Sequence, residues 1–155
     1  MDAHYYHVDV NWQMDRKGKL CSPELSKENG PCIEVATPPE FPKGMPGIWS
    51  PEHLFTAAVS SCLMTTFLSI AENSKLNFSS FSCQAKGKLE QMDGKFMMSE
   101  VILEPTVTIV DEKDEAKTLR ILEKSEAACL ISNSVTSKII MLPTIKIITN
   151  EGVVA

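Results

Sequence analysis

The 18 residues from Leu54 to Ala71 include no charged side chain, and this run restricts the possible folds more than any other part of the sequence. A charge-free run of this length is either a membrane-spanning helix or a helix buried in a protein core. Six hydroxyl residues interrupt it, and no cluster of Lys or Arg flanks either end to set an orientation in a membrane. We therefore expect a core helix and no membrane partner.

The start of this helix is marked by three consecutive residues. Ser50 is a suitable N-cap, Pro51 fits the first helical position, and Glu52 places a carboxylate in the first turn, where the helix dipole favours it. The helix is expected to end near Asn73. Apolar or small residues cover nearly its whole circumference, so protein should surround it on most sides. A partner chain is a natural source of part of that surface.

Length and charge limit the class of protein. The chain has 155 residues, of which 43% are hydrophobic and 23% charged, which predicts one compact globular domain over residues 1–155. The formal net charge is -5 and the lysines are scattered, so we expect no nucleic-acid partner. The N-terminus lacks the basic and apolar regions of a secretory signal, and we expect a cytoplasmic protein.

The rest of the sequence alternates between strand, turn and helix signals. Alternating residues predict a half-buried strand over 5–12 and a turn at 15–18, followed by a strand over 32–36 and a Pro/Gly-rich loop over 37–47. Strands over 77–91 and 95–110 should form a hairpin around Asp93 and Gly94. A second helix is expected over 112–128, with Ala116, Leu119 and Leu122 facing the core, and a last strand over 143–149. This order predicts an α+β fold.

The cysteines argue against two common roles. Five cysteines at irregular spacing, with no CxxC pair, favour neither a disulfide framework nor a structural zinc site. The histidines add no ligand cluster, so we expect no metal and no cofactor. Cys62, inside the charge-free run, is open to two interpretations. It is either a small hydrophobic residue that fills space or a thiol kept for its chemistry.

Two blocks of the sequence identify a family. The stretch GIWSPEHLFTAAVSSCLMTTFLSIAE (47–72), followed about 60 residues later by EAACLISNS (126–134), resembles the OsmC/Ohr family of osmotically inducible and organic hydroperoxide resistance proteins. The resemblance implies an α+β fold in which antiparallel sheets pack on two long central helices of an intertwined homodimer. It also implies a thiol-dependent peroxidase that reduces organic hydroperoxides, and in some members hydrogen peroxide, with an active site at each subunit boundary.

The resemblance also assigns roles to individual residues. The two family cysteines map onto Cys62 as nucleophile and Cys129 as resolving residue, with Glu52 as the glutamate at the helix start and Arg16 as the N-terminal arginine. The oxidised pair is expected to be reduced by a dithiol or a lipoylated protein. The remaining cysteines match no family context and are expected to be structural; they are Cys21, Cys32 and Cys83.

Peroxide chemistry requires a thiolate, and this requirement suggests a role for the arginine. Cys62 lies three turns inside its helix, where burial raises the pKa of a thiol, so a fixed cation is expected to activate it. The chain has two arginines, and Arg16 fits better than Arg120. Glu52 lies ten residues before Cys62, about 15 Å along an ideal helix. Glu52 and Cys62 can therefore contact the same arginine only if the start of the helix bends or if the carboxylate comes from the partner chain.

Less specific interpretations of these residues stay open. Arg16 could be a solvated turn residue, and Glu52 could serve only the helix dipole. The alternative function is a non-catalytic dimer of the same family that binds a small ligand or senses oxidants through the same cysteines.

Overall fold

The computed structural model describes residues 1–25, 30–149 and 152–154. The chain divides into two compact units, residues 1–54 and residues 55–155. The helix that contains the charge-free run begins in the first unit and continues into the second.

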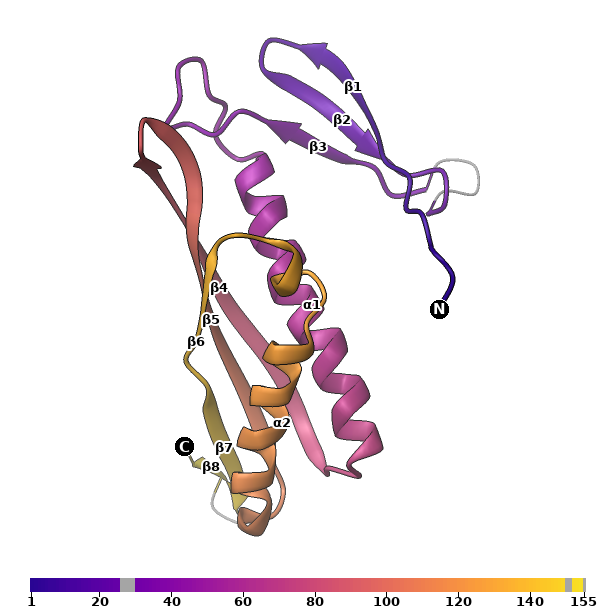
Figure 1. Ribbon diagram of the computed structural model, residues 1–155, viewed down its shortest axis with the longest axis vertical. Coiled ribbons are helices and arrows are strands. Elements are labelled where there is room, and N and C mark those ends of the chain that lie inside the picture. The colour runs from indigo at the N-terminus through magenta and orange to yellow at the C-terminus, as the bar shows by residue number, and fades with distance from the viewer. Residues whose placement is uncertain (26–29, 150–151, 155) are drawn as a thin grey trace. The chain divides into compact units, whose positions relative to one another are not determined.

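The first unit contains a three-stranded antiparallel sheet in the order β1-β2-β3. Its strands are β1 (Asp9–Met14), β2 (Lys17–Cys21) and β3 (Ile33–Ala36), shown in indigo and violet in Figure 1. A tight turn at Asp15 and Arg16 joins the first two strands, as expected, and Asp15 has a positive φ of 49°. All six residues of β1 are exposed among the described residues, so the expected half-buried strand is wrong.

A disulfide bond joins Cys21 to Cys32 across the β2–β3 ladder. The two cysteines lie directly beyond the last paired residues, Leu20 and Ile33, and their Cα atoms are 4.5 Å apart. The expectation of no disulfide framework is therefore wrong at this pair. Antiparallel pairing brings the two residues face to face, which their spacing along the sequence does not reveal.

The Pro/Gly-rich segment 37–47 is the expected loop, and backbone hydrogen bonds hold it in place. Met45 N–H donates to the carbonyl of Thr37, and Gly44 N–H donates to that of Phe41, both at 2.9 Å. A side chain at Gly44 would overlap the backbone of Pro38, so the loop closes on itself only with glycine there.

The helix α1 (Pro51–Asn73) has the expected bounds and a reciprocal N-terminal cap. The Ser50 hydroxyl oxygen accepts a hydrogen bond from His53 N–H at 3.2 Å, and Ser50 N–H donates to Nδ1 of His53 at 3.3 Å. His53 thus takes the place that Glu or Gln holds in a capping box.

The second unit is built on a long hairpin, β4 (Phe78–Met92) and β5 (Lys95–Ile109), joined at Asp93 and Gly94 as expected. The chain then forms a 3-10 turn, η1 (Glu112–Asp114), the helix α2 (Glu115–Ala128) and a second turn, η2 (Ser132–Ser134). Three short strands complete the sheet: β6 (Lys138–Met141), β7 (Thr144–Thr149) and β8 (Gly152–Val154). The sequence analysis expected only β7 among these three.

The sheet of the second unit is mixed, so the expectation of purely antiparallel sheets is wrong for this unit. Both β6 and β7 pair with β5 in parallel, while β4 with β5 and β7 with β8 are antiparallel. The reason is the crossover through α2, which returns the chain to the sheet in the direction of β5.

Both helices pack on one face of the β4–β5 hairpin (Figure 1). One hydrophobic cluster joins α1 to β5 through Val59, Leu63, Val101 and Leu103. A second cluster joins α1, α2 and β5 through Phe67, Ala71, Val107, Ile109, Ile121 and Leu122. Phe81 of β4 packs against both clusters, so the core is continuous along the hairpin.

The buried face of α2 differs from the expected one. Leu122 is buried as expected, but Ala116 and Leu119 are exposed, and the buried residues are Thr118, Ile121, Leu122 and Ser125. The buried hydroxyls donate to carbonyl oxygens four residues earlier, Thr118 to Asp114 and Ser125 to Ile121. Because both hydroxyls have hydrogen-bond acceptors within the helix, a helix face that contains Thr118 and Ser125 can pack in the core.

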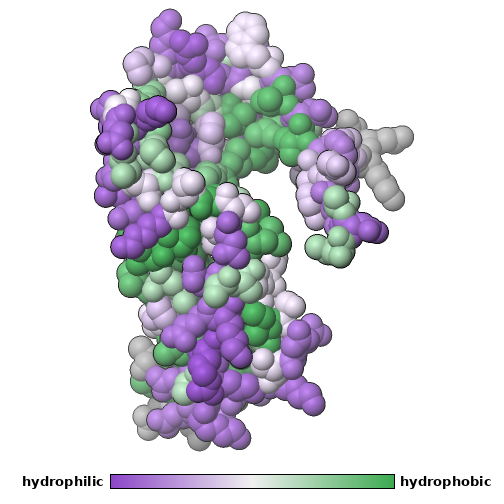
Figure 2. Space-filling view, viewed as in Figure 1, coloured by the Kyte–Doolittle hydropathy of each residue, from purple (hydrophilic) through white to green (hydrophobic). Residues whose placement is uncertain are grey.

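Among the described residues, the buried positions of α1 lie mainly on one side of the helix. Its buried residues are Val59, Cys62, Leu63, Phe67 and Ala71, whereas Met64 and Leu68 are 40% and 41% exposed. The sequence analysis expected a partner chain to supply part of the surface around this helix, and that expectation stays a prediction. Figure 2 shows hydrophobic surface along the part of the second unit where α1 runs. By length and composition alone, α1 also meets the criteria for a membrane-spanning helix.

Candidate active site

Two thiols meet where the middle of α1 passes the end of α2. Cys62 projects from the buried face of α1 and is 9% exposed, while Cys129 is fully buried. Cys129 is the C-cap of α2, and its backbone is extended with ψ at 110°. Both cysteines are free thiols, and their side chains are hydrogen-bonded to each other. The structure thus brings together the two cysteines that the sequence analysis paired.

Further hydrogen-bond donors surround the Cys62 sulfur. The Thr66 hydroxyl, one turn along α1, lies 4.0 Å from Cys62 Sγ. The backbone N–H groups of Ile131 and Leu130, in the turn that follows α2, also bind this sulfur. All of these groups are electrically neutral.

The balance of burial and hydrogen bonding lowers the pKa of Cys62. Burial raises this pKa, but the hydrogen bonds from the Cys129 thiol, Ile131 N–H, the Thr66 hydroxyl and Leu130 N–H outweigh it. Cys62 therefore ionises more readily than an ordinary thiol. Neutral donors thus contribute to the lowering that the sequence analysis assigned to a cation, and the activating role of Arg16 stays a prediction.

Cys129 behaves in the opposite way. Burial raises its pKa, and the hydrogen bond with Cys62 raises it further, against a smaller lowering by the side chain and backbone of Ser132. The pair is therefore unequal. Of the two thiols, Cys62 has the lowered pKa and Cys129 the raised pKa, so Cys62 ionises before Cys129.

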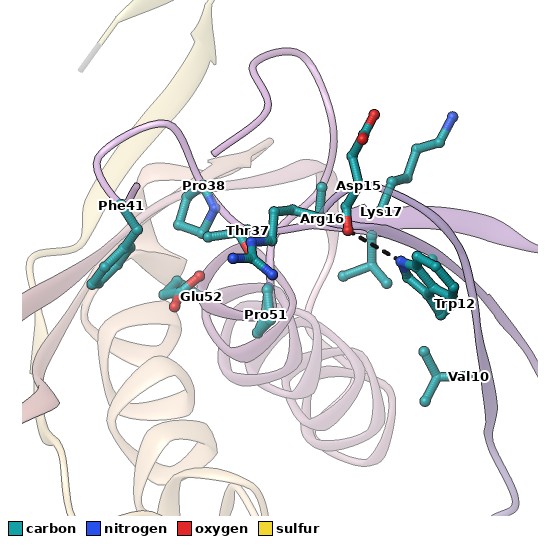
Figure 3. Close-up of a pocket in the computed structure, with 13 residues that line it drawn as sticks. Val10, Trp12, Asp15, Arg16, Lys17, Thr37, Pro38, Phe41, Pro51 and Glu52 are labelled. Carbon is teal, nitrogen blue, oxygen red and sulfur yellow. Dashed lines mark hydrogen bonds between the residues drawn. The ribbon is translucent and has the colours of Figure 1, made fainter. Parts of the chain in front are cut away.

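Arg16 and Glu52 line one pocket in the first unit. The pocket measures about 740 Å³ and is bordered by the β1–β2 turn, the end of β3, the 37–47 loop and the first residues of α1. Figure 3 shows the Arg16 guanidinium and the Glu52 carboxylate directed toward the same space, close to Pro38. The other walls are largely apolar, with Trp12 and Phe41 among them.

The four residues named from the sequence therefore lie in two pairs. Cys62 and Cys129 are in contact in the second unit, and Arg16 and Glu52 share a pocket in the first. Their catalytic roles stay predictions.

The sequence analysis missed the neutral donors around Cys62. The four-residue spacing from Cys62 to Thr66 is a usable signal, since residues four apart lie on the same face of a helix. The sequence carries no comparable signal for the backbone amides of Leu130 and Ile131, because the identity of a side chain does not predict the direction of the backbone N–H.

Two further residues with titratable side chains, His53 and Cys83, have other contacts. His53 caps α1 through Ser50. Cys83, on β4, donates to the carbonyl of Gln84 at 3.6 Å, and burial raises its pKa. Within the described residues, no group of three His, Cys, Asp or Glu side chains is arranged to hold a metal ion.

The sequence matches the family model described as OsmC-like protein over residues 44–141. No curated protein matches it.

Solved structures of similar fold extend over nearly the whole chain. An OsmC-like protein of unknown function from Vibrio cholerae has a TM-score of 0.80 at 23% identity, covering 91% of this chain and 99% of that one. An organic hydroperoxide resistance protein from Elizabethkingia anophelis has a TM-score of 0.71 at 22% identity, covering 93% and 96%. One from Legionella pneumophila has a TM-score of 0.68 at 16% identity, covering 94% and 98%. These likenesses establish a shared fold.

Proposed function

The chain belongs to the OsmC-like protein family, and we propose that it is a thiol-dependent peroxidase that reduces organic hydroperoxides. The observation that carries the proposal is the unequal, hydrogen-bonded pair of free thiols, Cys62 and Cys129. One thiol of lowered pKa beside one of raised pKa suits a nucleophile and a resolving residue. Two structural neighbours that carry the name organic hydroperoxide resistance protein support the choice of substrate.

The proposed reaction has three steps. The Cys62 thiolate attacks the terminal oxygen of the hydroperoxide, the O–O bond breaks, and the departing alkoxide takes up a proton to become an alcohol. Cys62 is left as a sulfenic acid. The sulfur of Cys129 attacks this sulfenic acid, releases water and forms a disulfide. A dithiol, or a lipoylated protein, then reduces the disulfide by two successive exchanges and is itself oxidised.

Arg16 and Glu52 are proposed to serve the same reaction. A guanidinium can bind a carboxylate along one edge and present further N–H groups on another, so Glu52 would orient Arg16 toward the substrate or the thiolate.

We further propose that the working form is a cytoplasmic homodimer. The apolar face that α1 leaves exposed supports a second copy as partner.

A second candidate function is non-catalytic ligand binding or oxidant sensing. The pocket of about 740 Å³ in the first unit favours it, because apolar walls beside Arg16 and Lys17 suit a small amphipathic ligand. A sensor would be oxidised once at Cys62 and Cys129 and would not turn over.

The test is consumption of cumene hydroperoxide with dithiothreitol as reductant. We expect the protein to consume many equivalents of peroxide. Cys62→Ser should do no better than buffer with dithiothreitol, because the nucleophile is gone. Cys83→Ser is the matched control, since it removes the free thiol on β4, and it should retain full activity. Consumption limited to about one equivalent would favour a sensor, and consumption equal to buffer would favour a binding protein.

A further inference from the structure

The hydroxyl groups of α1 differ in what they bind. Ser61 and Thr65 donate to backbone carbonyl oxygens one turn back, at 2.7 Å to Ala57 and 3.1 Å to Cys62. This is the usual arrangement for a hydroxyl inside a helix. Thr66 is paired instead with the side-chain sulfur of Cys62 at 4.0 Å. Its hydroxyl is thus directed at the thiol.

The ionisation of Cys62 decides which group donates in this pair. While Cys62 is a thiol, either group can donate. Once Cys62 is a thiolate it has no proton left, and only the Thr66 hydroxyl can supply one. The hydrogen bond then has a charged acceptor, which makes it stronger than the bond to the neutral thiol. The contact therefore favours the ionised form.

The turn after α2 supplies two more donors to the sulfur. Leu130 and Ile131 direct their N–H groups at Cys62, and other hydrogen bonds hold this turn in shape. Asn133 N–H donates to the Cys129 carbonyl at 3.0 Å, and the Ser134 hydroxyl donates to the Leu130 carbonyl at 2.7 Å. The carbonyl groups of Cys129 and Leu130 thus accept hydrogen bonds within the turn, while the N–H groups of Leu130 and Ile131 bind the sulfur.

We propose that Thr66 is a further catalytic residue, whose hydroxyl, together with the N–H groups of Leu130 and Ile131, holds the Cys62 sulfur in its ionised, attacking form. The proposal rests on the proposed function, in which Cys62 is the nucleophile. It assigns the activation of Cys62 to neutral donors of the second unit and leaves Arg16 free to act on the substrate.

The test measures the thiolate directly, without peroxide. The rate at which iodoacetamide alkylates Cys62 is followed from pH 5 to 10 by mass spectrometry of the peptide that contains it. Thr66→Val keeps the branched shape and removes the hydroxyl, and Thr66→Ser keeps the hydroxyl. Thr65→Val is the matched control, because Thr65 is the adjacent hydroxyl and bonds the backbone rather than the thiol.

We expect Thr66→Val to move the alkylation profile to higher pH. A rise of one unit in the pKa of Cys62 lowers the rate about tenfold at a pH below both midpoints and leaves the plateau at high pH unchanged. Thr66→Ser should titrate close to the parent protein, and Thr65→Val should superimpose on it. A Thr66→Val profile identical to that of Thr65→Val would overturn the proposal.

A backbone substitution provides an independent arm. Leu130→Pro deletes one N–H donor, and the extended backbone of Cys129 is a conformation that a following proline accepts. It should shift the profile in the same direction as Thr66→Val, and an unshifted profile would count against the N–H donors. The alkylation result is also separate from peroxidase activity. If the protein consumes peroxide but Thr66→Val does not shift the alkylation profile of Cys62, this proposal is overturned and the proposed function is not. If Thr66→Val shifts the profile but the parent protein shows no turnover of peroxide, the proposed function is overturned and this proposal is not.

Discussion

Cys129 is fully buried and has a raised pKa, and its proposed task begins only after Cys62 has been oxidised. Replacing Cys129 with Ser should therefore leave the first attack possible but remove the thiol that resolves the sulfenic acid. With excess peroxide, we expect Cys62 to advance to sulfinic acid, a gain of two oxygen atoms in the intact mass. The parent protein under the same conditions should lose two hydrogens and gain no oxygen.

Two comparisons sharpen this result. Cys62→Ser should gain no oxygen at position 62, and a small thiol added with the peroxide should protect Cys129→Ser by taking over the resolving step. If Cys129→Ser instead ends with the same mass change as the parent protein, another thiol resolves Cys62.

At the scale of elements, the 37–47 loop positions Pro38 and Phe41 in the wall of the Arg16 pocket. Gly44→Ala would place a methyl group against the backbone of Pro38, which cannot rotate away as a side chain can. We expect this substitution to cost about 1 to 3 kcal/mol, which is typical of overpacking. The melting temperature should fall by roughly 2 to 4 °C per kcal/mol for a chain of this size.

The control is Glu40→Ala, an exposed position in the same loop. Its melting temperature should stay within a degree or so of the parent value, since surface substitutions rarely change stability by more than about 0.5 kcal/mol. Equal melting temperatures for Gly44→Ala and Glu40→Ala would show that the loop rearranges to admit the methyl group.

At the scale of the whole molecule, α1 has an apolar surface that the described part of the chain leaves partly exposed, and Met64 and Leu68 belong to it. We expect a second copy to cover it, with an interface above about 2,000 Å², as in obligate dimers. Light scattering at micromolar concentration should then give twice the chain mass of 17.1 kDa. Replacing both Met64 and Leu68 with Glu should give monomers, because two buried carboxylates would lie unpaired in the interface.

Leu119→Glu is the matched control, because Leu119 is an equally exposed leucine on α2. It should remain dimeric. A parent protein that scatters as a monomer would rule out the proposed dimer, whatever the variants do.

Local signals in the sequence determined a large part of this structure. Ser50 and Pro51 set the start of α1, and Asp93 and Gly94 set the turn of the long hairpin, because caps and tight turns depend on residues adjacent in the chain. The paired sequence blocks likewise pointed to Cys62 and Cys129, and the structure brings these two residues into contact.

The tertiary structure decided what depends on residues far apart in the sequence. The parallel strand β6, the Cys21–Cys32 disulfide and the buried face of α2 each follow from pairing or packing with a distant segment. The same is true of the electrostatics at Cys62. Its identity as a cysteine was visible in the sequence, but its lowered pKa comes partly from amide groups about 70 residues away, and the direction of a backbone N–H is set only when the chain folds.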